Sequence, residues 1–285
     1  VGSETLGQTV GSTFDNKNVG SNKTVTVNSI TLADGTGLAA NYSISAGQTT
    51  TANITAKSLT VSGITASNKT YDGNGVATLD ASSVAYSGIV SGDIFNGTYM
   101  GAFSDKNVGS GKTVTITSSY TGADVSNYSV TDQSTTTANI TAKALTVSGI
   151  TASSKTYDGN TSATLDTSSV LYNGLVSGDT FNGSYTGAFS NANVGTGKTV
   201  TITSSYSGAD SGNYSVTDQS STTADISTKA LTATASASNK TYDGGTTAST
   251  TLTFTGLVGS ETLGQTVGST FDNKNVGSNK SVSVN

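Results

Sequence analysis

The sequence lacks five residue types, and several of these absences exclude a class of chemistry. Its 285 residues include no cysteine, histidine, proline, tryptophan or arginine. Without cysteine there is no disulfide framework and no thiol nucleophile, and without histidine the commonest general base is missing. Without proline, no prolyl isomerisation slows folding. We therefore predict no catalytic residues and no enzymatic activity.

Charge and long apolar runs are also scarce. Charged residues make up 11% of the chain, the formal net charge is −5 and the sequence pI is about 4.5. Nucleic-acid partners require clustered basic side chains, so we predict no nucleic-acid binding. No apolar run approaches the roughly 18 residues needed for a membrane helix, so we predict no membrane span.

The residues that are abundant do not by themselves favour a folded chain. A sequence rich in serine, threonine and glycine, with few charges, buries little apolar surface and can remain disordered. The apolar residues are nevertheless ordered in alternating runs, such as Lys-Thr-Val-Thr-Ile-Thr over residues 198–203. This period of two is typical of half-buried strands. We therefore predict an all-β chain.

One heptapeptide, Ser-(Asn/Ser)-Lys-Thr-Tyr-Asp-Gly, occurs three times. Its tyrosines are Tyr71, Tyr157 and Tyr242, which recur at a nearly constant interval. A fixed period of this length indicates tandem structural repeats. Residues 57–142 and 143–228 are two full repeats, residues 1–56 match the second half of a repeat, and residues 229–285 match the first half. We expect the chain to be a segment of a longer array.

Within each repeat of about 86 residues, short strands alternate with turn signals, which favours a small β-sandwich-like domain. Asp-Gly in the heptapeptide predicts a tight turn with a positive backbone angle. A short helix is a further possibility at 79–87 or 165–172. The junction between the full repeats, residues 135–147, contains no glycine. A stiff connection is therefore expected, and with it an elongated rod.

Four motifs in fixed order carry a family resemblance. They are Lys-Thr-Tyr-Asp-Gly, Gly-Leu-Val-Ser-Gly-Asp (174–179), Asn-Val-Gly-x-Gly-Lys (193–198) and Gly-Ala-Asp-x-x-Asn-Tyr-Ser (208–215). Together they resemble the YDG/MBG-type tandem repeats of large bacterial surface adhesins, including filamentous-haemagglutinin-like exoproteins. The resemblance covers essentially the whole chain. It implies a β-sandwich-like or mirrored β-grasp-like domain, in an extracellular, non-enzymatic stalk or filament segment.

Three functions remain open at this stage. In the first, the array is a spacer that projects a binding region away from the cell. In the second, each repeat is a weak module for glycans or a host surface, made effective by multivalency. In the third, the repeats associate with one another into an extracellular filament or biofilm matrix, through strand edges or donated strands.

No cofactor is predicted, and calcium is the one metal that the residues suggest. Oxygen-rich turns can hold Ca²⁺ weakly in extracellular modules. The favoured interpretation is structural, because aspartate in a turn commonly accepts backbone hydrogen bonds. The candidate ligands are Asp72, Asp158 and Asp243 in the heptapeptide, and Glu4, Asp93, Asp179 and Glu261 after the Val-Ser-Gly element and its equivalents.

The tyrosines are predicted to be anchors at the edge of the core, with buried rings and bonded hydroxyls. Stacking on sugars is the functional alternative. The structural motif comprises Tyr71, Asp72, Gly73, Tyr157, Asp158, Gly159, Tyr242, Asp243 and Gly244, and a second tyrosine series comprises Tyr42, Tyr128 and Tyr214.

The recurring lysines suggest a covalent alternative to disulfides. We hypothesise that Lys155, or its equivalent Lys69 or Lys240, forms an amide crosslink with an asparagine side chain, promoted by a buried acid. The opposing interpretation is a lysine whose stem packs on the tyrosine ring while its charge stays in water. Each crosslink would release one ammonia, so an intact mass equal to that of the sequence excludes it.

Overall fold

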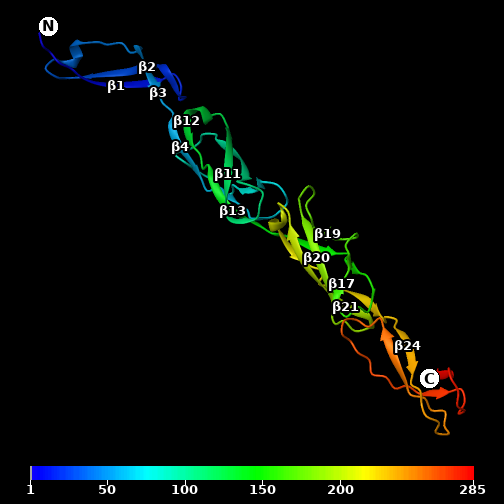
Figure 1. Cartoon of the computed structure of the whole chain (residues 1–285). Coiled ribbons are helices and arrows are strands. Elements are labelled where there is room, and N and C mark those ends of the chain that lie inside the picture. The colour runs from blue at the N-terminus through cyan, green and yellow to red at the C-terminus, as the bar shows by residue number, and fades with distance from the viewer. Residues whose placement is uncertain (1) are drawn as a thin grey trace. The chain divides into compact units, whose positions relative to one another are not determined.

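The computed structural model describes residues 2–285, which form strands of two to 14 residues, turns and three single-turn 3₁₀ helices (Figure 1). The all-β prediction is confirmed. The short helix predicted at 79–87 or 165–172 is wrong, because those segments form short strands joined by turns. No helix among residues 2–285 is long and apolar enough to cross a bilayer. The chain divides into two compact units, residues 1–143 and 144–285, described here in turn.

The first unit begins with a three-stranded antiparallel sheet in the order β1-β2-β3. Threonine and valine alternate along its long central strand, which is the pattern that predicted strands here. Its elements are β1 (Gly7–Phe14), β2 (Gly20–Ala33), the 3₁₀ helix η1 (Ala39–Asn41) and β3 (Thr49–Ile54).

The second repeat, residues 57–142, completes the first unit. Its first strand begins only three residues after β3 ends. The elements are β4 (Lys57–Ser62), β5 (Thr65–Ala66), β6 (Lys69–Thr70), β7 (Val76–Ala77), β8 (Leu79–Asp80), β9 (Ala85–Ser87), β10 (Asn96–Phe103), β11 (Gly109–Thr121), η2 (Val125–Asn127), β12 (Tyr128–Thr131) and β13 (Thr135–Thr141).

These strands form two main sheets in the second repeat. The larger has the order β6-β13-β11-β10-β7, and the smaller has the order β12-β4-β9. Two pairings are parallel, β12 with β4 and β13 with β6. One core cluster takes side chains from both sheets, including Leu59 and Val61 of β4 and Ile116 of β11, with Phe95 between them. Packing of one sheet on the other makes the repeat sandwich-like.

The second unit contains the third repeat with the same topology, its sheets being β16-β23-β21-β20-β17 and β19-β14-β22. Its elements are β14 (Lys143–Ser148), β15 (Thr151–Ala152), β16 (Lys155–Thr156), β17 (Ser162–Ala163), β18 (Leu165–Asp166), β19 (Leu171–Asn173), β20 (Asn182–Phe189), β21 (Gly195–Ser207), η3 (Ser211–Asn213), β22 (Tyr214–Thr217) and β23 (Ser221–Ser227).

The fourth repeat contributes two hairpin-like pairs to the second unit, β24 with β25 and β26 with β27. An isolated bridge pairs Thr247, in the segment between β24 and β25, with Thr270 of β26. These strands are β24 (Thr232–Ala237), β25 (Thr250–Thr255), β26 (Ser269–Phe271) and β27 (Val282–Val284).

A phenylalanine surrounded by tyrosines packs in the core of each complete repeat. The Phe181 ring lies 5.3 Å from Tyr172, 5.1 Å from Tyr206 and 5.6 Å from Tyr214, measured between centroids. The second repeat has the same arrangement around Phe95. Edge-on and tilted contacts of this kind add stability beyond simple burial, which a repeat without disulfides needs.

The Asp-Gly turn of the heptapeptide has the positive φ angle at glycine that its sequence predicts. Gly73, Gly159 and Gly244 have φ angles of 83°, 78° and 79°. The turn does not join two paired strands, however. In the third repeat it connects β16 to β17, which lie at opposite edges of the five-stranded sheet. Only five residues separate these two edge strands, so the sheet curls until its edges approach each other.

Candidate functional site

The Lys155 ammonium lies where the two edges of the curled sheet meet. Its Nζ donates to Asp158 Oδ1 at 2.7 Å, to Asn160 O at 2.8 Å, to Asn160 Oδ1 at 3.0 Å and to Ser162 O at 3.1 Å. The same nitrogen lies 5.4 Å from the centroid of the Phe189 ring. One ammonium thus links β16, the heptapeptide turn and β17. We call residues 155–162 and their equivalents the lysine loop.

The other two lysine loops repeat this arrangement. Lys69 Nζ lies 2.7 Å from Asp72 Oδ1 and within 3.1 Å of three oxygens of Asn74 and Val76. Lys240 Nζ donates to Asp243 Oδ1 at 2.8 Å and to Gly245 O at 3.0 Å. These lysines lie over phenylalanine rings, not over the tyrosine of the heptapeptide. The prediction that the lysine charge stays in water is wrong, because each ammonium is held by oxygens of its own loop.

Local turn chemistry holds the oxygens of the lysine loop in place. Asp158 Oδ1 accepts the Asn160 amide at 3.1 Å, and Asn160 Oδ1 accepts the Ser162 amide at 2.9 Å. Such turns are a common use of Asp and Asn side chains. The hydrogen-bonded Lys155 ammonium keeps the pKa of the Asp158 carboxyl below its ordinary value.

The lysine loop already contains a cation, and this bears on the calcium prediction. Ca²⁺ takes six to eight oxygen ligands in typical protein sites. At Asp72, Asp158 and Asp243 the carboxylate and the neighbouring carbonyls face a lysine ammonium, which a metal ion would have to displace. Among residues 2–285, no three acidic side chains lie close enough together to hold a metal ion.

The same geometry bears on the crosslink hypothesis. Lys155 Nζ and the Asn160 side chain are in contact, and Asp158 is the neighbouring acid. Amide formation requires an amine with a free lone pair, whereas this nitrogen donates hydrogen bonds to oxygens of Asp158, Asn160 and Ser162. Asp158 is 46% exposed in its side chain and favours ionisation, so it differs from the buried acid that the hypothesis requires. The arrangement supports an ionic link between the sheet edges.

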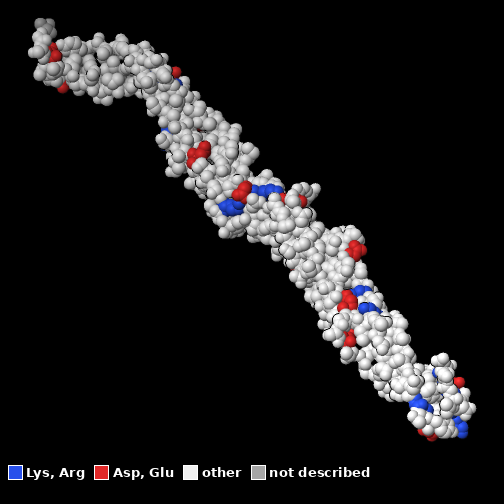
Figure 2. Space-filling model, in the orientation of Figure 1, with Lys and Arg blue, Asp and Glu red and all other residues white. Residues whose placement is uncertain are grey.

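A second lysine connects the two repeats of the first unit. Lys17, in the turn between β1 and β2, places its Nζ 2.9 Å from Asp93 Oδ1 and 2.8 Å from Asp124 Oδ1. Nearby, the Val19 amide donates to Asn127 Oδ1 at 2.9 Å. We call these contacts the lysine bridge. Figure 2 shows such charged side chains as small groups of both signs on a largely neutral surface.

The two aspartates of the lysine bridge are held by their own repeat. Tyr128 donates its hydroxyl to Asp93 Oδ2 at 2.6 Å, and the Ile94 amide donates to Asp124 Oδ2 at 2.9 Å. The Tyr128 hydroxyl and then Lys17 lower the pKa of Asp93, whereas Lys17 and then the Ile94 amide lower that of Asp124. Both carboxylates in turn raise the pKa of Lys17.

Tyrosine placement differs along the chain. Tyr128 and Tyr214 are 8% exposed and hydrogen-bonded through their hydroxyls to Asp93 and Asp179. Tyr71 is buried as well, whereas Tyr42 and Tyr242 are exposed. The two calcium candidates Asp93 and Asp179 are therefore acceptors for tyrosine hydroxyls.

The joint between the third and fourth repeats, within the second unit, uses different residues. Ala192 occupies the position of Lys17 in the repeat alignment, so the ammonium is missing there. The Tyr157 hydroxyl donates to Glu261 at this joint. Beside it lies a small cavity of about 230 Å³, whose lining includes Val194 and Val258.

Sequence reasoning identified the lysine loop only in part and missed the lysine bridge. Lys17, Lys106 and Lys274 share one place in the Phe-x-x-Lys-Asn-Val-Gly turn, and that recurrence was the available signal. The charge partners of Lys17, Asp93 and Asp124, belong to the following repeat and are distant in sequence. Only the packing of one repeat on the next brings them together.

Comparison with known families accounts for the repeat pattern. The profile of the YDG domain matches four consecutive segments, residues 1–52, 55–138, 141–224 and 227–285. The chain belongs to the YDG domain family. No curated protein and no solved structure matches it significantly. The resemblance predicted from the four motifs is confirmed.

Replacing Lys155 with methionine tests the lysine loop. Lys155→Met removes the charge that links the two sheet edges and leaves the Asp158 and Asn160 oxygens without their donor. We expect the Tyr157 and Phe189 amides, which donate to Ser227 and Thr161, to exchange about tenfold faster. Site-resolved hydrogen exchange on the full chain provides the measurement. Lys229→Met, at an exposed lysine, is the matched control, and equal exchange in the two variants would contradict the role assigned to Lys155.

Acidification tests the lysine bridge. The pKa values of Asp93 and Asp124 are lower in the folded chain than their ordinary value of about 3.9. The stability that these two carboxylates give the folded chain is therefore complete above that ordinary pKa. It is lost as the pH falls through their lowered pKa values. We expect the Val19 amide to lose protection below about pH 4. In Lys17→Met it should lack that protection at neutral pH as well. Lys57→Met is the control; unchanged Val19 exchange in Lys17→Met would refute the bridge.

Proposed function

We propose that the chain is a non-enzymatic stalk or filament segment of a bacterial cell-surface or secreted adhesin, where it projects a binding region away from the cell. Membership of the YDG domain family and the four consecutive repeats support this role. An extracellular location fits the low charge and the serine- and threonine-rich surface. The lack of histidine and cysteine supports the non-enzymatic part of the proposal.

The observation that carries the proposal is the lysine bridge of the first unit. A spacer must keep the angle between consecutive repeats nearly fixed. Side-chain contacts across a joint restrict that angle more than a flexible linker does. Lys17 reaches two carboxylates of the following repeat, and the Val19 amide adds a neutral hydrogen bond beside it. Two contact points a short distance apart restrict rotation about the joint.

Short connections support the same role. One residue, Ala142, separates β13 from β14, and two residues separate β3 from β4. Connections of this length leave few rotatable bonds between consecutive repeats. Neither connection contains glycine or proline, so neither provides a ready hinge.

Small-angle X-ray scattering of the dilute chain tests the proposal. A compact globule of this length would have a radius of gyration of about 19 Å. We expect a monomer with a radius well above that value, because a spacer whose connections allow little bending would keep its repeats apart. A variant with a flexible Gly-Ser insertion after Ala142 should give a smaller average radius. A wild-type radius close to that of the globule, or no change on insertion, would refute the spacer role.

A further inference from the structure

Strand β10 of the second repeat is paired along only part of one side. On the other side it pairs with β11 over its whole length, from Asn96 to Phe103. On the incompletely paired side, β7 pairs with Gly101 and Ala102 alone. No other strand among residues 2–285 pairs with β10, so residues 96–100 form an open edge of the five-stranded sheet. We call residues 96–100, and the equivalent residues 182–186 of β20, the free edge.

Alternate backbone groups of β10 point out of the free edge. The Phe103 amide donates to the loop before β7, whereas the Ser104 amide donates to β11 on the opposite side. Successive residues of a strand direct their N–H and C=O groups to opposite sides. Gly97 and Tyr99 therefore point in the same direction as Phe103. Each presents one donor and one acceptor to the open side.

Strand β20 of the third repeat has the same free edge. Its short neighbour β17 pairs with it only at residues 187–188, and the Phe189 amide donates to the loop before β17. Gly183 and Tyr185 lie at the positions of the two outward residues of β10. The free edge is thus a property of the complete repeat, and it occurs once in each unit.

Side chains cover the opposite long edge of the same sheet. Strand β13 lies there, and β6 pairs with only two of its residues. Ahead of that pairing the Asn139 amide donates to Asn68 Oδ1 at 2.7 Å, and Gln133 Nε2 donates to Thr135 O at 3.3 Å. The third repeat has equivalent contacts. No side chain among residues 2–285 bonds the backbone of the free edge in this way.

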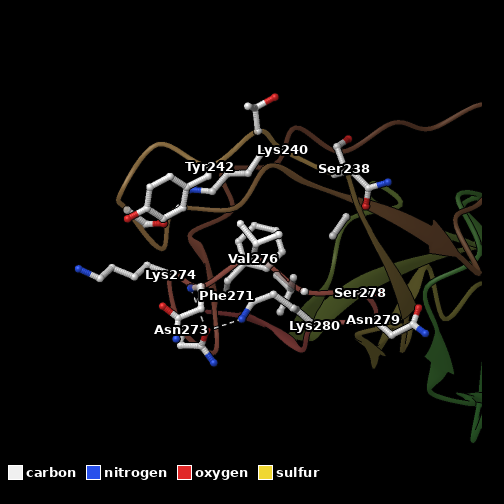
Figure 3. A pocket seen from close by; sticks show the side chains of 17 residues that line it. Ser238, Lys240, Tyr242, Phe271, Asn273, Lys274, Val276, Ser278, Asn279 and Lys280 are labelled. Carbon is white, nitrogen blue, oxygen red and sulfur yellow. Dashed lines mark hydrogen bonds between the residues drawn. The ribbon is translucent and has the colours of Figure 1, made fainter.

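The free edge also lacks the features that keep exposed strands apart. Natural edge strands are protected by short length, bulges, charges or proline. Strand β11 has a bulge just before Lys112, whose Nζ donates to Asp105 Oδ1 at 2.7 Å. Figure 3 shows the equivalent contact of the fourth repeat, from Lys280 to Asn273. By contrast, β10 pairs with β11 without a register shift, contains no charged residue, and has a Met100 side chain that is 72% exposed.

We propose that the free edge pairs with the free edge of a second copy of this chain, in an antiparallel register centred on Thr98 in β10 or on Ser184 in β20. In β10 this register places Gly97 of each copy opposite Tyr99 of the other. Each opposed pair then exchanges both of its N–H···O bonds, so every outward group is satisfied at once. Two five-stranded sheets become one continuous sheet through a self-complementary contact.

The side chains of the free edge suit this pairing. Thr98 would face Thr98 of the second copy at a position where side chains lie close together, and threonine pairs are favourable there. Residues 96–100 and 182–186 contain no charged side chain that would repel the second copy. Because each unit has one free edge, association can continue beyond two copies. This pairing goes beyond the stalk role, since it joins one copy of the chain to another.

Hydrogen exchange on the full chain tests the free edge directly. At high dilution we expect the Gly97 and Tyr99 amides to exchange at least about tenfold faster than those of Thr98 and Met100, which face β11. As the concentration rises, Gly97 and Tyr99 should become protected, and the equivalent residues of β20 should behave alike. Equal exchange of these four amides at high dilution would overturn the open edge. Association that leaves Gly97 and Tyr99 unprotected would overturn the pairing.

Sedimentation velocity tests the second copy as the partner. The wild-type chain should form larger species as its concentration rises. Thr98→Lys combined with Ser184→Lys places like charges opposite each other in the proposed register, so this double variant should stay monomeric.

The matched control is Thr115→Lys combined with Thr201→Lys. These exposed residues lie on β11 and β21 where both sides of the strand are paired, and the change in net charge is the same. The control should associate as the wild type does. Equal behaviour of the two double variants, or a wild-type chain that is monomeric at every concentration, would overturn the proposal. These outcomes leave the stalk proposal standing, since scattering at high dilution tests it separately.

Discussion

The lysine ammonium that joins the two edges of each five-stranded sheet is the interaction on which the repeat depends. β16 and β17 lie at opposite edges, and only five residues connect them. The sheet must therefore curl, and the Lys155 ammonium binds oxygens from the turn and from β17 while facing the Phe189 ring. Open sheet edges invite unwanted pairing, so this closure also protects the repeat. In this repeat a charge held by several oxygens takes the structural role that a disulfide has in many small secreted domains.

The sequence was sufficient to predict the repeats, the all-β class and the Asp-Gly turn, because these depend on spacing and local backbone preference. It was not sufficient to predict the parallel pairing of β4 with β12, which joins the start of the repeat to a strand near its end. Alternation of apolar and polar residues predicts that a segment is a strand, but it does not predict which strand it pairs with. Lys155 was singled out by recurrence, but its partner ring Phe189 was not, because the contact depends on the curl of the sheet. Lys17 escaped notice for the same reason, since its acceptors belong to another repeat.

The repeats share one fold, but different residues form the contacts between consecutive repeats. Lys17 bridges two carboxylates in the first unit, whereas Ala192 stands at the equivalent position of the third repeat, where a tyrosine–glutamate contact replaces the bridge. In both complete repeats the last strand lies between the strand of the recurring lysine and the long central strand, as β13 does between β6 and β11.

The parallel pairing of β4 with β12 has a mechanical consequence. β4 opens the second repeat, and β12 lies near its end, followed by β13. Tension that passes through β13 to β12 therefore pulls β4 and β12 in opposite directions along their shared axis. Their inter-strand hydrogen bonds, which run across that axis, are then loaded in shear and must fail together. An antiparallel pair pulled from one end would open one bond at a time. Each complete repeat is therefore built to resist extension more strongly than its modest core would indicate.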